Sequence, residues 1–431
     1  MININYLQDS DFKSADFVDL QRRFDSIRTS GDVGFFDLPD QETEVQEIRS
    51  YLQTIDQSID TLLLIGIGGS SLGCITIYDA LIKANNKRKF YCLDNVDSDR
   101  LHLIMAKCNP HKTLVNVVSK SGGTPETMSN FMIVYTQFRQ VLGDQVNKHF
   151  VFTTDPKKGT LNKIAAAENI NTFSIPETVG GRFSILSPVG LLLTEFMGYK
   201  SEDLLRGAAD LREELNEAKN SMSQYALTLY IENMKAGKRN SVLMPYSSQL
   251  KSLSDWYCQL WAESLGKEKN LDNQIVNSGQ TPISSLGAND QHSTVQLFME
   301  GPNDKYFTFI QVDQSENLVE ISNPFPDIKE FNLYDGQQLH TVLNSELKAT
   351  AFALKKNKRS VAIISIPVLN EYYLGQLFFF FQVATVYSSI LYHINCFDQP
   401  GVEAGKLATK ALLGDQTLLQ LKREIEEIFN K

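Results

Sequence analysis

The sequence predicts an α/β protein with two doubly wound, mainly parallel sheets that are flanked by helices. Two observations support this prediction. The chain has 431 residues, which is more than one ordinary hydrophobic core accommodates. Short apolar runs also alternate with helical stretches in two separate parts of the chain, and continuous apolar runs are typical of parallel strands buried on both faces.

The expected elements can be placed in chain order. Residues 1–60 read as helices with polar faces, for example over residues 44–55. Strands of the first sheet are expected at residues 61–67, 89–93, 113–118 and 149–153, with helices between them that include residues 126–142. A mainly helical stretch at 201–236 leads to strands at 241–244, 306–312 and 360–366. We therefore expect one domain over residues 45–200 and a second, larger domain formed by residues 1–44 and 201–431.

One apolar segment, residues 372–396, has the length of a membrane span and contains four consecutive phenylalanines. Polar side chains interrupt it at Gln376, Gln382 and His393, so we expect a buried central helix and no membrane association. The chain begins Met-Ile-Asn-Ile-Asn, which lacks the basic and apolar regions of an export signal.

Composition narrows the class of protein further. A net charge of −10 argues against a nucleic-acid partner, because no basic stripe is available to displace phosphate counterions. The five cysteines are scattered without a Cys-x-x-Cys pair, and the six histidines are dispersed as well. This usage suits reduced thiols in the cytoplasm and gives no metal-binding pattern.

A turn rich in glycine and serine follows the first expected strand directly. Residues 66–73 depart from a dinucleotide fingerprint because Ser71 stands where a glycine is needed, and they lack the ending of a nucleotide P-loop. What remains is a strand-to-helix turn with exposed amides and hydroxyls, which suits a phosphate at the positive end of a helix. The candidate ligands here are Gly69 and Ser70.

A second such turn, residues 119–126, follows the third expected strand, and Pro125 fits the first turn of the next helix. Its candidate phosphate ligands are Ser119, Lys120, Ser121 and Thr124. Each turn alone could be a capping turn without a ligand. Two of them at the carboxyl ends of strands in one sheet favour a phosphorylated small molecule, because ligands of open α/β sheets bind there.

Residues 177–190 place Arg182 directly after two glycines, which let the backbone approach a ligand closely. A guanidinium stays protonated at neutral pH, so Arg182 cannot act as a base, but it can stabilise a developing oxyanion. A surface turn with a solvated arginine is the alternative interpretation of this motif alone.

Glu263 lies near the end of an expected helix that Gly266 terminates, seven residues after Trp256 and on nearly the same face. A carboxylate there is expected to be partly desolvated and close to the negative end of the helix dipole, and both effects disfavour its ionised form. These features suit a general base. The alternative is a glutamate that extends into solvent at a helix end.

Two further segments carry candidate groups. His292 ends a loop of small residues that starts at Gly287. Lys406 belongs to a segment in which Asp398 near the cap and Pro400 in the first turn predict the start of a helix. Taken alone, His292 reads as a surface histidine, and Lys406 could pair with a neighbouring glutamate on a solvated face.

Together these segments closely resemble the phosphoglucose isomerase family, which is built from two sugar-isomerase (SIS) domains. Residues 177–190 match one family pattern throughout and residues 389–406 match the other, in the family's order and with the phosphate loops upstream. The resemblance covers most of the chain. It implies reversible conversion of glucose 6-phosphate to fructose 6-phosphate without a metal or an organic cofactor.

The resemblance also implies roles for individual residues. Glu263 would move the proton between C1 and C2, and Arg182 would stabilise the cis-enediolate. His292 and Lys406 would help to open the sugar ring, and Gln399 would line the sugar site. In the family the histidine comes from the partner subunit, so a homodimer is implied.

The phosphate would be held by Ser70, Ser119, Ser121 and Thr124, together with Lys120 acting through its backbone. Gly123 stands where many family members have a threonine, which removes one hydroxyl donor. Two alternatives stay open. One is a dual isomerase that also accepts mannose 6-phosphate. The other is a non-catalytic sugar-phosphate-binding SIS regulator, which would need neither Glu263 nor the Lys406 segment.

Overall fold

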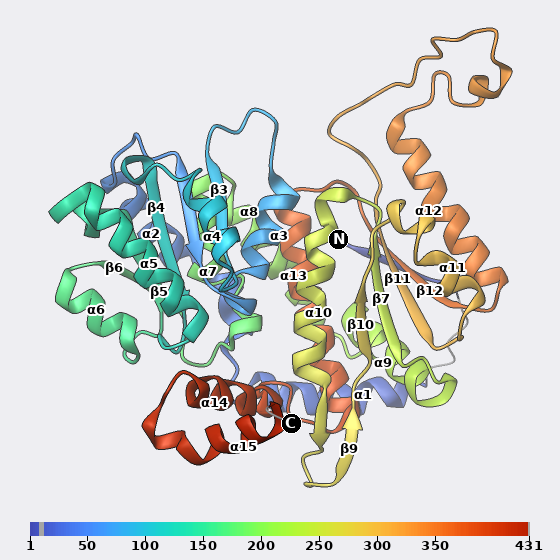
Figure 1. Ribbon diagram of the computed structural model, residues 1–431. Coiled ribbons are helices and arrows are strands. Elements are labelled where there is room, and N and C mark those ends of the chain that lie inside the picture. Colours follow the sequence, from blue (N-terminus) through green and yellow to red (C-terminus); the bar gives the residue numbers. More distant parts are fainter. Residues whose placement is uncertain (8–12, 430–431) are drawn as a thin grey trace.

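A computed structural model describes residues 1–7 and 13–429 of the chain and contains two five-stranded sheets (Figure 1). The first sheet is parallel throughout, in the order β3-β2-β4-β5-β6. Its strands are β2 (Thr61–Ile65), β3 (Lys89–Leu93), β4 (Thr113–Ser119), β5 (Phe150–Thr154) and β6 (Asn171–Ser174). Every residue of β2, β4 and β5 is buried, as the continuous apolar runs of the sequence predict.

Helices cover both faces of this first sheet. One apolar cluster joins one face to α4 (Ser98–Met105), α5 (Pro125–Leu142) and α6 (Thr160–Glu168). The opposite face packs with α2 (Glu42–Thr54), α3 (Leu72–Leu81) and α7 (Pro188–Met197) in the largest cluster of the protein. The expected doubly wound arrangement is therefore confirmed for this half of the chain.

The second sheet has the order β1-β12-β11-β7-β10 and is parallel except for the edge strand β1. Its strands are β1 (Asn3–Tyr6), β7 (Asn240–Pro245), β10 (Thr281–Ser284), β11 (Lys305–Val312) and β12 (Ser360–Ile366). One face packs on α11 (Val295–Glu300) and α12 (Leu339–Lys356). The other face packs on α9 (Ser221–Ala236), α10 (Lys251–Leu265) and α13 (Glu371–Tyr392), and this second sheet is therefore also covered on both faces.

The central helix α13 is the apolar segment that the sequence singles out. By length and composition it could cross a membrane, but 94% of its most apolar stretch is buried inside the protein. The helices α1 (Ser14–Arg28) and α8 (Ser201–Arg212) pack against it, and it lies between the two sheets in Figure 1. The prediction of a buried central helix is confirmed.

The expectation that residues 1–60 are helical is wrong at the amino terminus, because Asn3–Tyr6 forms β1; residues 8–12 of that stretch lie outside the described residues. The strands β6 and β10 and the hairpin of β8 (Lys267–Lys269) and β9 (Ile275–Ser278) were not predicted either. These strands are short, and several lie at sheet edges with exposed residues, so they lack the apolar run that marks a buried strand.

The carboxyl-terminal helices lie below the first sheet in Figure 1. Here a 3₁₀ turn, Pro400–Val402, precedes α14 (Glu403–Leu412), and α15 (Leu419–Phe429) follows. A helix does begin after Asp398, although Val402 occupies its cap position. The end of α10 and the segment that leads into α14 approach each other, and Arg182 contacts Glu263 and Gln399 there.

Candidate active site

Arg182 lies in a short 3₁₀ turn, Gly181–Phe183, and is only 5% exposed, so the alternative of a solvated surface arginine is wrong. The turn packs directly against the first glycine-rich loop. A side chain at Gly69 would place its Cβ 2.4 Å from the carbonyl carbon of Gly181. Glycine at position 69 is therefore what lets the candidate phosphate loop reach the arginine.

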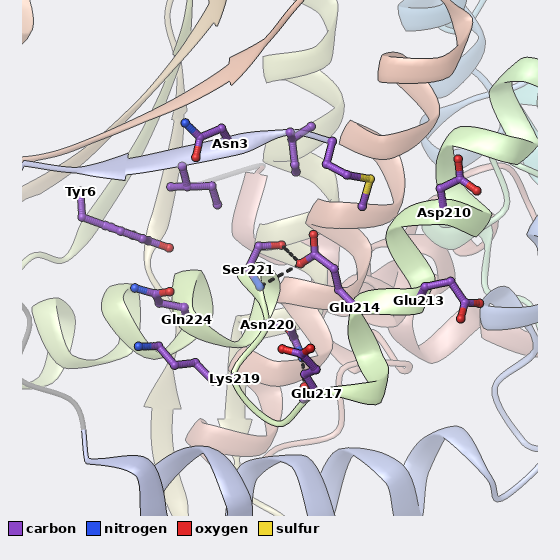
Figure 2. A pocket seen from close by; sticks show the side chains of 13 residues that line it. Asn3, Tyr6, Asp210, Glu213, Glu214, Glu217, Lys219, Asn220, Ser221 and Gln224 are labelled. Atoms are coloured by element: carbon purple, nitrogen blue, oxygen red, sulfur yellow. Dashed lines mark hydrogen bonds between the residues drawn. The ribbon is translucent and has the colours of Figure 1, made fainter.

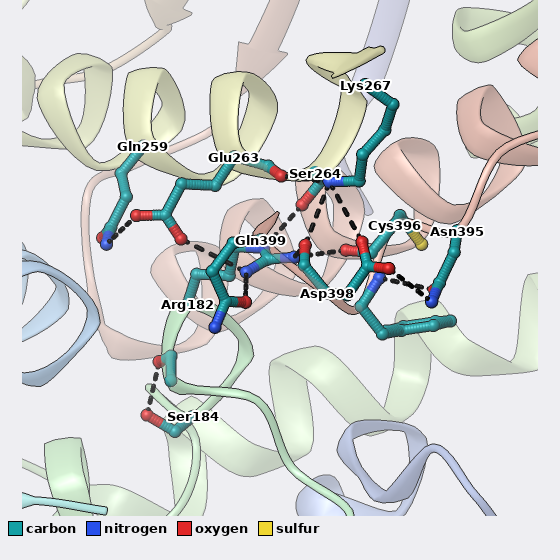
Figure 3. Close-up of polar contacts among 12 residues, drawn as sticks. Arg182, Ser184, Gln259, Glu263, Ser264, Lys267, Asn395, Cys396, Asp398 and Gln399 are labelled. Atoms are coloured by element: carbon teal, nitrogen blue, oxygen red, sulfur yellow. Dashed lines mark hydrogen bonds and ion pairs between the residues drawn. The ribbon is translucent and has the colours of Figure 1, made fainter. Parts of the chain in front are cut away.

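Five groups fix the guanidinium of Arg182 (Figure 3). Its Nε donates to Ser264 Oγ at 2.8 Å, and Nη1 donates to Glu263 Oε2 at 3.2 Å. Nη1 also donates to Gln399 Oε1 at 3.0 Å. Nη2 donates to the carbonyl oxygens of Cys396 and Asp398. Burial lowers the pKa of the guanidinium, and the carboxylate of Glu263 opposes that shift.

Glu263 lies on the last turn of α10, which Gly266 terminates as the sequence predicts. Its side chain is 32% exposed, so the carboxylate is partly desolvated and still open to a ligand. One carboxylate oxygen accepts from Arg182, and the other accepts from Gln259 Nε2 at 3.0 Å. The ion pair with Arg182 was not part of the sequence-based prediction for this carboxylate.

Two residues of this cluster, Gln259 and Lys267, were not predicted from the sequence. Gln259 precedes Glu263 by four residues, so both project from one face of α10, and that spacing could have identified it. Its amide also abuts Gly68, where an added Cβ would lie 2.7 Å from Gln259 Nε2. Lys267 is buried beside Arg182, and a lysine just past a helix end is a recognisable signal because it can bind the last carbonyls.

In the second candidate phosphate loop, two serine hydroxyls lie within hydrogen-bonding distance of a threonine hydroxyl. Thr124 Oγ1 lies 3.2 Å from Ser119 Oγ and 3.4 Å from Ser121 Oγ. The Lys120 ammonium instead donates to the carbonyl oxygens of Glu177 and Val179, at 2.7 and 2.8 Å. The lysine side chain therefore ties this loop to the segment that leads into Arg182. Burial lowers the pKa of Lys120.

Ser70 belongs to the first loop, the 3₁₀ turn Gly68–Ser70, which connects β2 to α3. The second loop connects β4 to α5, and β2 and β4 are neighbours in the sheet. Both loops therefore lie at the carboxyl edge of the first sheet, on adjacent strands. The first loop packs against Gly181 through Gly69, and Lys120 of the second loop bonds to Val179. Both loops therefore adjoin the segment that carries Arg182.

His292 and Lys406 are not part of this contact network. His292 is exposed at the end of the turn Asn289–His292, and the next helix, α11, packs on the opposite face of the second sheet from α10. Lys406 is also exposed, and its Nζ donates to Glu403 at 2.7 Å. Among residues 1–7 and 13–429, no hydrogen bond or ion pair joins either residue to Arg182.

Two cavities lie elsewhere in the described part of the chain. One of about 560 Å³ adjoins β1, and four carboxylates line it together with one lysine (Figure 2). That charge balance disfavours a phosphate. The carboxylates belong to Asp210, Glu213, Glu214 and Glu217. The other, about 980 Å³, adjoins the carboxyl ends of β7, β11 and β12, and none of the predicted site residues lines either cavity.

The chain is similar in sequence to known proteins of one family. A family model described as phosphoglucose isomerase matches residues 41–421. The chain is 37% identical to the glucose-6-phosphate isomerase of Carboxydothermus hydrogenoformans, over 98% of this chain and 95% of that protein. It is 36% identical to a glucose-6-phosphate isomerase of Thermus thermophilus, over 88% of this chain and 90% of that protein.

Solved structures are similar as well. A hypothetical protein from Thermus thermophilus matches with a TM-score of 0.87 and 34% identity, covering 93% of this chain and 95% of that one. A glucose-6-phosphate isomerase from Chlamydia trachomatis matches with a TM-score of 0.78, covering 98% of this chain and 79% of that one. Because its identity is 23%, this second likeness concerns the fold alone.

Proposed function

This chain belongs to the phosphoglucose isomerase family, and we propose that it interconverts glucose 6-phosphate and fructose 6-phosphate through a cis-enediolate. Glu263 is the base and Arg182 stabilises the intermediate. One observation supports this assignment above the others: Arg182 Nη1 lies 3.2 Å from Glu263 Oε2. The carboxylate can accept a proton, and the fixed guanidinium beside it can stabilise negative charge.

The proton transfer between C2 and C1 depends on these two groups. Glu263 removes the proton from C2 of the open-chain aldose and returns it to C1, while the hydroxyl proton moves from O2 to O1. Negative charge develops on oxygen between the two transfers. The guanidinium of Arg182 is already oriented by Ser264 and Gln399, so it can stabilise that charge without reorganising.

The two loops at the carboxyl edge of the first sheet are the proposed phosphate site. Hydroxyls of Ser70, Ser119, Ser121 and Thr124 and backbone amides of Gly69 and Lys120 would hold the phosphate. The Lys120 ammonium is occupied by two carbonyl oxygens, which supports a role for its backbone. Remote binding of the phosphate would orient C1 and C2 towards Glu263.

Ring opening is assigned to His292 and Lys406 on the family resemblance. Both residues are exposed and lie outside the Arg182 cluster of the same chain. We propose that the chain forms a homodimer and that His292 acts in the site of the partner subunit. Gln399, which accepts a hydrogen bond from Arg182, would line the sugar site.

A coupled assay with fructose 6-phosphate tests the proposal most directly, and mannose 6-phosphate tests the dual isomerase. Glu263→Gln keeps the shape of the side chain and removes the base, so kcat is expected to fall about 10²- to 10⁴-fold with the fold intact. Glu268→Gln, an exposed glutamate five positions on, is the matched control and should keep wild-type turnover. Near-normal turnover of Glu263→Gln would refute the base assignment.

A further inference from the structure

Lys267 is a buried cation that the reaction described above does not use. Its side chain is 5% exposed, and it follows directly after Gly266, the residue that ends α10. A buried ammonium is costly unless acceptors surround it, so its partners indicate its role.

Two hydrogen bonds and one ion pair hold the ammonium (Figure 3). Lys267 Nζ donates to the carbonyl oxygen of Glu263 at 2.6 Å and to the carbonyl oxygen of Asp398 at 3.0 Å. It also pairs with the carboxylate Oδ1 of Asp398 at 3.5 Å. The last hydrogen bond of α10 runs from Gly266 N to Ala262 O, so the carbonyl of Glu263 is the first that the helix leaves unpaired.

The second acceptor of Lys267, the carbonyl oxygen of Asp398, also binds Arg182. The carbonyl oxygen of Asp398 also accepts from Arg182 Nη2 at 3.0 Å. The next residue, Gln399, accepts from Arg182 Nη1 at 3.0 Å. Lys267 therefore connects the backbone of the proposed base to the segment that orients the guanidinium.

We propose that Lys267 is a positioning residue for the reaction. Its ammonium fixes the end of α10 against the Asp398–Gln399 segment and so sets the relative placement of Glu263 and Arg182. The inference rests on the proposed function. It assigns no contact between Lys267 and the substrate.

The charges around the Lys267 ammonium act in opposite directions. Burial lowers the pKa of Lys267, and the nearby Arg182 lowers it further, while Asp398 opposes both. The acceptor oxygens of Glu263 and Asp398 offset the cost of burying this second cation, so the ammonium holds together the two segments that carry them.

Lys238 offers a matched control for the loss of a buried ammonium. It is 4% exposed, burial also lowers its pKa, and its Nζ donates to the carbonyl and side-chain oxygens of Asn303. These contacts join the residues before β7 and β11, and none of them involves Arg182 or Glu263. Lys238→Met therefore removes a comparable group without touching the site.

The experiment compares Lys267→Met with Lys238→Met by steady-state kinetics with fructose 6-phosphate and by thermal unfolding. Because small misplacements of reacting groups are costly, Lys267→Met is expected to lower kcat about 10- to 100-fold while KM changes less than about threefold. Affinity for an enediolate-mimicking hydroxamate should fall in parallel with kcat. Inhibition by inorganic phosphate should stay unchanged, because its site lies at the two loops.

Lys238→Met should lower Tm by a similar amount and keep kcat within about twofold of wild type, since its contacts are remote from the site. If Lys267→Met does not fold, Lys267→Gln, which retains a donor, replaces it in the same comparison. Equal kcat losses in the two variants at equal Tm losses would overturn the inference, as would a loss confined to KM. Failure of the proposed function itself would be recognised separately, because the wild-type protein would then not convert fructose 6-phosphate; normal turnover of Glu263→Gln would refute only the base assignment.

Discussion

Arg182 and His292 are both expected to act on the sugar, but one chain holds them very differently. Arg182 is 5% exposed and bonded to five groups, one of which is Glu263. His292 lies on the surface, and the exposed Lys406 pairs with its neighbour Glu403. Among the described residues of one chain, Glu263 and Arg182 are in contact, whereas no hydrogen bond or ion pair joins His292 or Lys406 to Arg182.

This difference separates two requirements of the reaction. Stabilising a transient charge needs donors that are fixed in advance, because reorganisation would consume the stabilisation. Opening a ring needs acid–base groups within reach of the ring oxygen, and a second subunit can supply them. Variants of the two sets of residues should therefore respond to different measurements.

Loss of the fixed guanidinium should have a larger effect than loss of a ring-opening group. Arg182→Ala is expected to lower kcat about 10²- to 10³-fold, the cost of removing a donor aimed at a developing oxyanion. Affinity for a hydroxamate that mimics the enediolate should fall far more than affinity for the substrate. Isothermal titration with the hydroxamate, together with steady-state kinetics, measures both quantities.

Arg212→Ala provides the control for loss of an ion-paired arginine. Arg212 Nη1 pairs with Asp40 at 2.7 Å, and burial leaves 16% of its side chain exposed. This variant should keep wild-type kcat, although it loses some stability. Equal weakening of substrate and hydroxamate by Arg182→Ala would mean that Arg182 only binds phosphate or maintains the fold.

The origin of His292 can be tested by mixing subunits. His292→Ala is expected to lower kcat about 10- to 100-fold, as for loss of a general acid or base. If His292 acts in the partner's site, mixed dimers of His292→Ala and Glu263→Gln contain one intact site. Refolding the two impaired variants together in equal amounts should then raise activity to about a quarter of the wild-type value, because about half of the dimers are mixed.

Mixing should recover nothing if each chain supplies its own histidine, and that outcome would contradict the proposed homodimeric site. A control refolding of each variant alone separates true complementation from recovery of damaged protein. The result also decides whether the exposed His292 acts in the site of its own chain or in that of the partner subunit.

The sequence predicts the strands that are buried on both faces, because burial requires a continuous run of apolar residues. β2, β4 and β5 are buried along their whole length, so each appears as an uninterrupted apolar run. β6 exposes three of its four residues, and β10 carries Pro282 at a sheet edge, so neither has such a run. Edge strands depend on a neighbour that the local sequence does not describe.

The site was predictable to the extent that its signals are local. Glycines, hydroxyls and a helix end mark the loops and Glu263, and the structure places Arg182, Glu263 and Gln399 in contact. The place of Lys267 just past a helix end could have indicated its contact with the carbonyl of Glu263, but its contact with Asp398 joins residues 131 positions apart. That second contact depends on tertiary structure and has no periodicity that a single sequence displays.

Removing one hydroxyl from the phosphate loop should have a moderate effect. Thr124 precedes α5, but its hydroxyl makes no capping hydrogen bond, so Thr124→Val should leave the helix intact. Loss of one neutral hydrogen bond to the phosphate is expected to raise KM about three- to tenfold with kcat nearly unchanged. Thr127→Val is the control, because that buried hydroxyl has no partner among the described residues.

Adding a hydroxyl to the same loop should have the smallest effect. An added Cβ at Gly123 would meet no atom within 4 Å, so Gly123→Thr fits without displacing a neighbour. One further exposed hydrogen bond to the phosphate is expected to lower KM about twofold. Gly122→Ala is the contrasting variant: Gly122 has φ +63° and its Cβ would lie 2.8 Å from Thr160 N, so Tm should fall. An unchanged or higher KM for Gly123→Thr would place the phosphate out of reach of position 123, and the proposed role of Thr124 would then depend on its own variant alone.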